Sequence, residues 1–151
     1  MMRLALAFCL TGQVASAACS DDKVSVKGDF GLAHFSVDLA DDPQERAQGL
    51  MFVEEMGTLE GMLFIYEAPR NATFWMRNTL IPLDMLFTDD TGVITHIHEN
   101  AVPLDETTID GGDDVLAVLE VNGGLSTRLG IKVGDVLQHP AFGANAVLPC
   151  E

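Results

Sequence analysis

The residues best suited to chemistry lie in one stretch, Phe74 to Phe87, which reads FWMRNTLIPLDMLF. It places the only Trp of the chain, Trp75, close to Arg77 and Asn78, and Asp84 follows after a short apolar run. The stretch fits neither the helical nor the strand period, which indicates a turn where polar groups must be satisfied among apolar ones. Because ligand pockets are mostly apolar with a few polar contacts, we predict that Trp75, Arg77, Asn78 and Asp84 bind a ligand.

Two further charges, Arg46 and Glu120, stand beside apolar runs and are predicted to support this site. Buried charges are costly unless they are paired and hydrogen-bonded, so the same residues could instead form internal salt bridges that fix strand register. The flat face of Trp75 suits a small envelope-derived ligand such as a sugar, and a protein partner is the other ligand class that we consider. Both interpretations describe a non-catalytic binding or accessory module.

An enzymatic alternative uses Asp84 and Glu120 as a carboxylate pair for acid–base hydrolysis. This hypothesis requires that the two side chains meet in space, which their spacing in the sequence does not determine. The chain contains no G-x-S-x-G, no H-E-x-x-H and no glycine loop that could hold a phosphate. We therefore assign no catalytic residue.

A metal alternative rests on thioethers and imidazoles, which are ligands for Cu(I). His96 and His98 are two residues apart and are expected on one face of a strand. Methionine also fills irregular cores, so the same residues could be purely structural, and no cofactor is predicted. The methionines concerned are Met51, Met56, Met62, Met76 and Met85.

The elements around these residues are short. Alternating apolar residues predict a strand within Phe30 to Ala40, and Asp42 with Pro43 predicts the start of a helix that ends at Gly49. Asn122 is the expected cap of a second short helix. The sequence thus predicts an α+β fold, mainly β, with a compact curled or barrel-like sheet and two short helices. Further strands are expected at Gly61 to Tyr66, on either side of Ile81-Pro82, at Val93 to His98, Val115 to Val121 and Gly134 to Gln138.

Several motifs in a fixed order resemble domain of unknown function family 192, over about residues 35 to 138. The resemblance implies a small β-rich domain, exported or cytoplasmic, without an established activity. Arg77 stands where Lys is common in this family, and the two cations differ in hydrogen-bond geometry. The motifs are Glu45-Arg46, Gly49-Leu50-Met51, Gly61-Met62-Leu63-Phe64, Phe74 to Thr79, Ile81 to Asp84, Val118-Leu119-Glu120 and Gly134-Asp135.

The N-terminus predicts export. Residues 1–17 have a positive charge at Arg3, an apolar run and small residues before the expected cleavage after Ala17 or Ala18, which is the layout of a signal peptide. Residues 18–151 are predicted to form a single globular domain in the periplasm or outside the cell, with no transmembrane segment. Lipidation of Cys19 is the alternative at this end of the chain.

Removal of the signal peptide leaves two cysteines, Cys19 and Cys150. An even pair in an exported protein predicts a disulfide, which for so long a loop would contribute roughly 4–5 kcal/mol in the chain-entropy model. The formal net charge of −15 disfavours nucleic acid as a partner, because the phosphate backbone would be repelled. The ligand, the metal, if any, and the oligomeric state are left open by the sequence.

Overall fold

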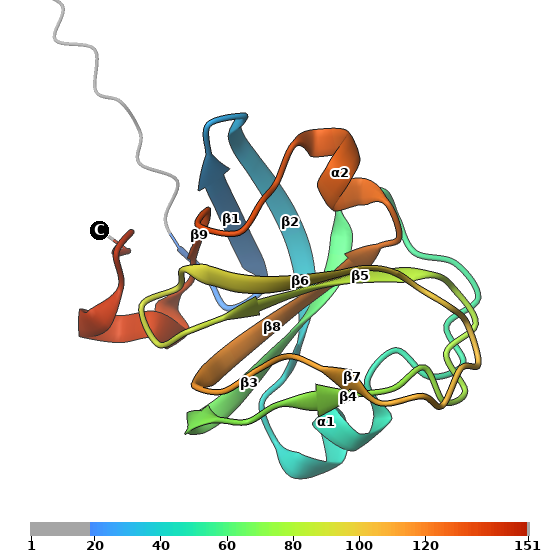
Figure 1. Cartoon of the computed structure of the whole chain (residues 1–151). Coiled ribbons are helices and arrows are strands. Elements are labelled where there is room, and N and C mark those ends of the chain that lie inside the picture. The colour runs from blue at the N-terminus through green and yellow to red at the C-terminus, as the bar shows by residue number, and fades with distance from the viewer. Residues whose placement is uncertain (1–18, 151) are drawn as a thin grey trace, which may run out of the picture.

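The computed structural model describes residues 19–150, so the predicted signal peptide lies outside the described residues (Figure 1). Short strands dominate the fold, and short helices cover parts of the sheet. The strands are β1 (Lys23–Gly28), β2 (Gly31–Ala40), β3 (Glu60–Arg70), β4 (Thr73–Phe74), β5 (Leu83–Thr88), β6 (Ile94–Ala101), β7 (Ile109–Asp110), β8 (Val115–Asn122) and β9 (Val136–Gln138). The helices are α1 (Pro43–Gln48), α2 (Leu125–Leu129) and the 3-10 helix η1 (Pro140–Asn145).

Seven strands form one sheet in the order β6-β5-β8-β3-β2-β1-β9, and β4 pairs with β7 in a separate two-stranded ribbon. The large sheet curls strongly into a half-barrel (Figure 1). Its two edge regions approach each other at an isolated antiparallel bridge between Val93 and Val136, and the backbone N–H of Ile94 donates to the carbonyl of Asp135 at 2.8 Å. The predicted fold, mainly β with a curled sheet, is confirmed.

The curled sheet separates two apolar clusters. The inner cluster contains Phe35, Leu63, Leu119 and Leu137. The outer cluster contains Phe64, Met76, Met85, Phe87 and Val118 and lies on the opposite face of the same central strands. Because side chains alternate along a strand, neighbouring residues of β8 such as Leu119 and Glu120 point into different environments.

Helix α1 has the predicted start. The side chain of Asp42 accepts hydrogen bonds from the backbone N–H groups of Gln44 and Glu45, both at 2.8 Å, which satisfies donors that the first helical turn leaves free. Gly49 ends the helix with a positive φ of 48°, and a side chain at this position would press against Phe64.

Two details of the helix prediction are wrong. The cap of α2 is Gly124, in the left-handed conformation, whereas Asn122 ends β8 and donates through its amide to the carbonyl of Gly57 at 2.8 Å. A third short helix, η1, follows the last strand, so the expectation of two helices was too low. The side chain of His139 caps η1 by accepting from the backbone N–H of Ala141 at 3.1 Å.

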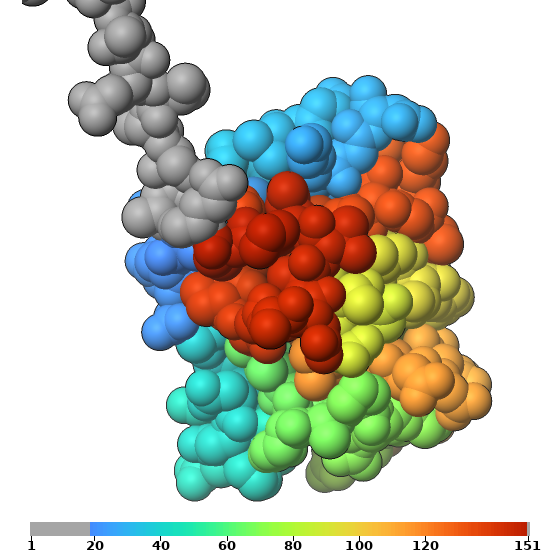
Figure 2. Space-filling view, turned by 90° about the vertical axis from the view of Figure 1, so that its left-hand side faces the viewer, coloured from blue at the N-terminus to red at the C-terminus, as the bar shows by residue number. Residues whose placement is uncertain are grey.

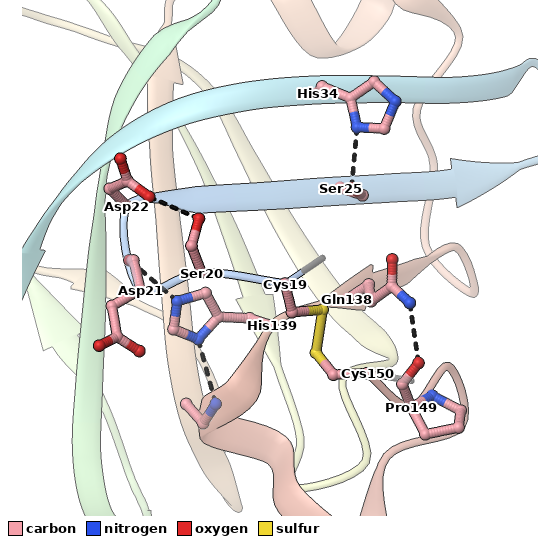
Figure 3. The surroundings of a disulfide bond; sticks show 11 residues. Cys19, Ser20, Asp21, Asp22, Ser25, His34, Gln138, His139, Pro149 and Cys150 are labelled. Atoms are coloured by element: carbon pink, nitrogen blue, oxygen red, sulfur yellow. Dashed lines mark hydrogen bonds between the residues drawn. A yellow bond between two sulfur atoms is a disulfide. The ribbon is translucent and has the colours of Figure 1, made fainter. Parts of the chain in front are cut away.

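The two ends of the described chain lie together. Cys19 and Cys150 form a disulfide with a Cα–Cα distance of 5.6 Å, and His139 faces the carbonyl of Asp21 beside it (Figure 3). The C-terminal segment lies between the N-terminal strands and the β5–β6 turn (Figure 2), where the backbone N–H of Val147 donates to the carbonyl of Thr91 at 2.9 Å. The sequence therefore identified both members of the bridge, which is consistent with export.

Candidate functional site

A small cleft lies on the outer face of the sheet, between α1 with the residues that follow it and the segment that connects β4 to β5. It has a volume of about 40 Å³. We call this feature the α1 cleft. Its lining contains four of the six predicted site residues, namely Arg46, Trp75, Arg77 and Glu120, together with Ala47, Gln48, Gly49, Leu50, Met51, Phe64, Phe74 and Thr79.

Glu120 is the buried polar residue of the α1 cleft. In the sheet it lies opposite Met62 of β3 on one side and opposite Met85 of β5 on the other. Only 4% of the residue is exposed. Gly61 keeps this region close-packed, because a side chain there would collide with the carbonyl oxygen of Glu120. The carboxyl group therefore lies between the two methionines of the neighbouring strands and lines the cleft.

The protonation of Glu120 follows from this burial. No group in residues 19–150 donates a hydrogen bond to its carboxyl, and desolvation raises its pKa from 4.5 to about 8. Burial is the cause of this rise in pKa, and the positive charges of Arg46 and Arg77 do not offset it. At neutral pH the group therefore carries a proton and can donate a hydrogen bond into the cleft.

Trp75 and Arg77 form the exposed rim of the cleft. Trp75 is 46% exposed, and the guanidinium carbon of Arg77 lies 5.3 Å from the centre of its ring, in the range of a cation–π contact. The Nε atom of Arg77 lies 3.5 Å from the carboxylate of Glu106, and 53% of the Arg77 side chain remains exposed. A flat aromatic surface and a cation are thus both available to a ligand at the mouth of the cleft.

Arg46 belongs to the wall of the cleft and holds α1 against β3. One terminal nitrogen donates to the carbonyls of Asp41 and Ile65, at 2.6 and 2.7 Å, and the other pairs with Glu67 at 2.8 Å. Its guanidinium also lies 5.3 Å from the centre of the Tyr66 ring. Both terminal nitrogens therefore already have protein partners, and Arg46 supports the cleft by fixing its helix.

Asn78 shapes the rim without lining the cleft. Its backbone adopts a φ of 53°, a left-handed conformation that Asn tolerates better than most residues. Its carbonyl accepts from the backbone N–H of Phe52 at 2.8 Å, and its side-chain amide lies 3.9 Å from the sulfur of Met51. Asn78 thereby ties the segment after α1 to the segment after Trp75.

Asp84 lies away from the other predicted site residues. It is fully buried, and its carboxylate accepts hydrogen bonds from the backbone N–H groups of Asn100, Gly124 and Ser126 and from the Ser126 hydroxyl. These contacts join β5 to the end of β6 and to the start of α2. The structure does not bring Asp84 to the α1 cleft, and its carboxylate is occupied by protein donors.

The register of β5 and β8 separates the two acids of the hydrolase hypothesis. Asp84 lies opposite Val121 in the sheet, whereas Glu120 lies opposite Met85. Val121 packs into the inner cluster and Met85 into the outer one. Since opposite residues of a ladder share a face, Asp84 and Glu120 point to different faces of the sheet. The predicted acid–base pair is therefore wrong.

The residues of the copper hypothesis are only partly brought together. Met56, Met62, Met76 and Met85 all belong to the outer cluster or pack against it, and His98 lies opposite Met85. His96, however, stacks on Phe87, with a distance of 5.6 Å between ring centres. Within residues 19–150, no group of three or more His, Cys, Asp and Glu side chains converges to hold a metal ion. Copper binding stays a prediction.

The comparisons with known proteins agree with this architecture. Residues 24–139 match the family described as domain of unknown function 192, uncharacterised ACR, and the chain belongs to this family. The resemblance stated from its motifs is thereby confirmed. No curated protein matches the chain significantly.

The solved structures that are similar to the chain include two bacterial proteins. A protein of unknown function from Novosphingobium aromaticivorans is 50% identical with a TM-score of 0.75, and the match covers 76% of this chain and 82% of that one. A Sinorhizobium meliloti protein, described as a candidate transcription regulator, is 41% identical with a TM-score of 0.78, covering 83% of this chain and 98% of that one. Within residues 19–150 there is no helix with the length and apolar character that a membrane crossing requires.

The two buried acids give opposite predictions for stability. We expect Asp84→Asn to lower the free energy of unfolding by roughly 3 kcal/mol or more, because an amide nitrogen cannot accept from the Ser126 donors and leaves them unsatisfied. Denaturant unfolding followed by circular dichroism measures this loss. A change below about 0.5 kcal/mol, typical of surface substitutions, would contradict the structural role of Asp84.

For Glu120→Gln we expect the free energy of unfolding to exceed that of the wild type by an amount that grows with pH. Folding raises the pKa of Glu120 from 4.5 to about 8, so the unfolded chain loses this proton at a lower pH than the folded protein. The free energy of unfolding of the wild type therefore falls as the pH rises between these two values. The variant lacks this loss, and its advantage over the wild type should grow by roughly 4 kcal/mol from pH 4.5 to pH 8. Equal pH profiles of the two proteins would show that Glu120 ionises normally.

Proposed function

We propose that this protein is a non-catalytic binding module of the cell envelope whose α1 cleft receives a hydrogen-bond-accepting group of a small ligand. The observation that carries the proposal is the carboxyl of Glu120, which is 4% exposed, has no donor among residues 19–150 and lines an open cleft. No fully buried side-chain nitrogen or oxygen among residues 19–150 lacks a hydrogen-bond partner. The Glu120 carboxyl, which has none within the chain, therefore reaches the cleft, where water or a ligand can supply the partner.

The size of the cleft limits what enters it. A volume of about 40 Å³ holds two or three water molecules, so a ligand can insert one small polar group only. The protonated Glu120 can donate to a carbonyl or carboxylate oxygen, whereas an amine has no acceptor lone pair once it is protonated. The remainder of the ligand would lie on the exposed ring of Trp75, with Arg77 beside it.

N-acetylated envelope sugars combine the features that this geometry favours. Their acetamide carbonyl is a small acceptor that can reach Glu120, and their rings present a face that can pack on Trp75. The disulfide between Cys19 and Cys150 supports an exported location, periplasmic or extracellular, where such molecules occur.

A role on nucleic acid receives less support. The Sinorhizobium meliloti relative is described as a candidate transcription regulator. This chain, however, carries a formal net charge of −15 with eight Lys and Arg in all, and DNA binding generally depends on neutralising phosphates with cations. The charge of this chain therefore disfavours a regulatory role on DNA.

The test uses Trp75, the only Trp of the chain, as the reporter. The intrinsic fluorescence of the mature, disulfide-bonded protein is titrated with N-acetylglucosamine, N-acetylmuramic acid and envelope peptides at pH 6 and pH 9. We expect saturable binding of an acetamide ligand at pH 6 and about tenfold weaker binding at pH 9, because Glu120 loses its proton between these values.

Variants separate this account from a general pH effect. Glu120→Gln keeps a donor in the cleft without a titrating group, so its affinity should be similar at both pH values. Glu54→Gln removes an exposed carboxyl outside the cleft and should behave like the wild type. Binding that is absent at both pH values, or that falls equally at pH 9 in the Glu120→Gln variant, would contradict the proposed role of the cleft.

A further inference from the structure

A second surface of the molecule exposes large apolar side chains outside the α1 cleft. They are carried by three connecting segments that gather at the end of the sheet drawn on the right of Figure 1. Phe52 is 67% exposed and Leu104 is 59% exposed. We call this surface the loop face, and its exposed apolar residues are Phe52, Leu80, Val102 and Leu104.

Main-chain hydrogen bonds hold the three segments together. The N–H of Phe52 donates to the carbonyl of Asn78 at 2.8 Å, and the N–H of Leu104 donates to the carbonyl of Thr79 at 3.1 Å. Phe52 and Leu104 therefore flank the same two residues, directly before Leu80. The backbones that carry Phe52, Leu80 and Leu104 are therefore held close together, whereas single exposed apolar residues on most proteins are scattered.

Two of the exposed residues have a strained backbone conformation. Phe52 has a φ of 66° and Leu104 a φ of 65°, in the left-handed region that bulky side chains rarely adopt. Neither side chain recovers the cost of this strain by burial, since both lie mostly in solvent. Strained residues of this kind tend to gather at functional sites.

The charges beside the loop face are acidic. Glu54 and Glu55 follow Phe52 in the same segment, and Asp105 and Glu106 follow Leu104, all exposed to solvent. Arg77 is the neighbouring cation, and it is paired with Glu106. With a net charge of −15, an anionic membrane or a second copy of this chain would meet like charge at this surface.

We propose that the loop face binds an apolar segment of another protein that is flanked by Lys or Arg. The apolar side chains would contact Phe52, Leu80, Val102 and Leu104, and the cations would meet the acidic residues beside them. This interaction is separate from ligand binding in the α1 cleft and does not depend on it.

The experiment measures fluorescence anisotropy of three labelled twelve-residue peptides with the mature, disulfide-bonded protein. The first alternates Leu and Lys, the second replaces Leu by Ser, and the third replaces Lys by Glu. We expect the Leu/Lys peptide to bind at least tenfold more tightly than either of the others, and its binding to weaken in 0.5 M NaCl because the contacts between charges are screened.

The decisive variant is the double substitution Phe52→Asn and Leu104→Asn. Asn is tolerated at positive φ, so the variant should melt at the same or a higher temperature while it loses at least tenfold in affinity for the Leu/Lys peptide. Leu32→Asn removes an exposed apolar side chain from the β1–β2 hairpin and should change nothing.

Three results would overturn the proposal. One is equal binding of the Leu/Lys peptide by the wild type and the double variant. Another is wild-type dimerisation in sedimentation that the double variant abolishes, which would make a second copy the occupant. The third is binding to vesicles of phosphatidylcholine with phosphatidylglycerol that requires Phe52 and Leu104, which would make a membrane the occupant.

Discussion

A carboxyl group inside an apolar sheet must either find hydrogen-bond donors or give up its charge, and this constraint governs the centre of the molecule. Asp84 meets it with four protein donors and remains a structural acceptor that joins β5 to α2 and the end of β6. Glu120, one position away in the sheet register, meets it by holding a proton. Two acids of the same central sheet thus have opposite roles, set by which face each side chain enters.

The curl of the sheet explains why these environments differ. The inner face closes over a continuous apolar core that includes Phe35 and Leu119. The outer face is covered by α1 with the residues after it, by the β4–β7 ribbon and by the segment around Trp75 and Asn78. A small opening between α1 and the Trp75 segment reaches Glu120. Arg46 fixes the helix on one side of that opening, while Arg77 leaves its cation at the mouth. A residue whose burial lowers stability at neutral pH is thereby placed in the wall of an open cleft.

The sequence allowed the fold to be predicted better than the site. Asp42 with Pro43 marked α1 correctly, since capping is a local interaction that the sequence alone displays. The strand β1 was missed even though Val24 and Val26 alternate within it, because the run is short and lies beside a charged turn. The cap of α2 was misplaced because Asn122 bonds to the segment near Gly57, a contact made 65 residues away.

The site was harder to predict for a related reason. Trp75, Arg77, Arg46 and Glu120 were identified from their types, and they line one cleft. Asp84 and Glu120 look alike in the sequence, as single acids within apolar strands, and only the tertiary donors around Asp84 distinguish them. Met51 and Thr79 also line the cleft. Met51 was considered only as a copper ligand, a core residue or part of a family motif, and Thr79 only as part of a family motif, because neither residue type by itself indicates a binding site.

The proposed binding depends on a Glu120 carboxyl that is protonated at neutral pH and free to donate into the α1 cleft. The most direct measurement is a pH titration of the side-chain carboxyl ¹³C resonances by NMR, with the Glu120 signal assigned by its loss in the Glu120→Gln variant. We expect a pKa of about 8 for this group. A pKa near 4.5, the ordinary value for Glu, would contradict it.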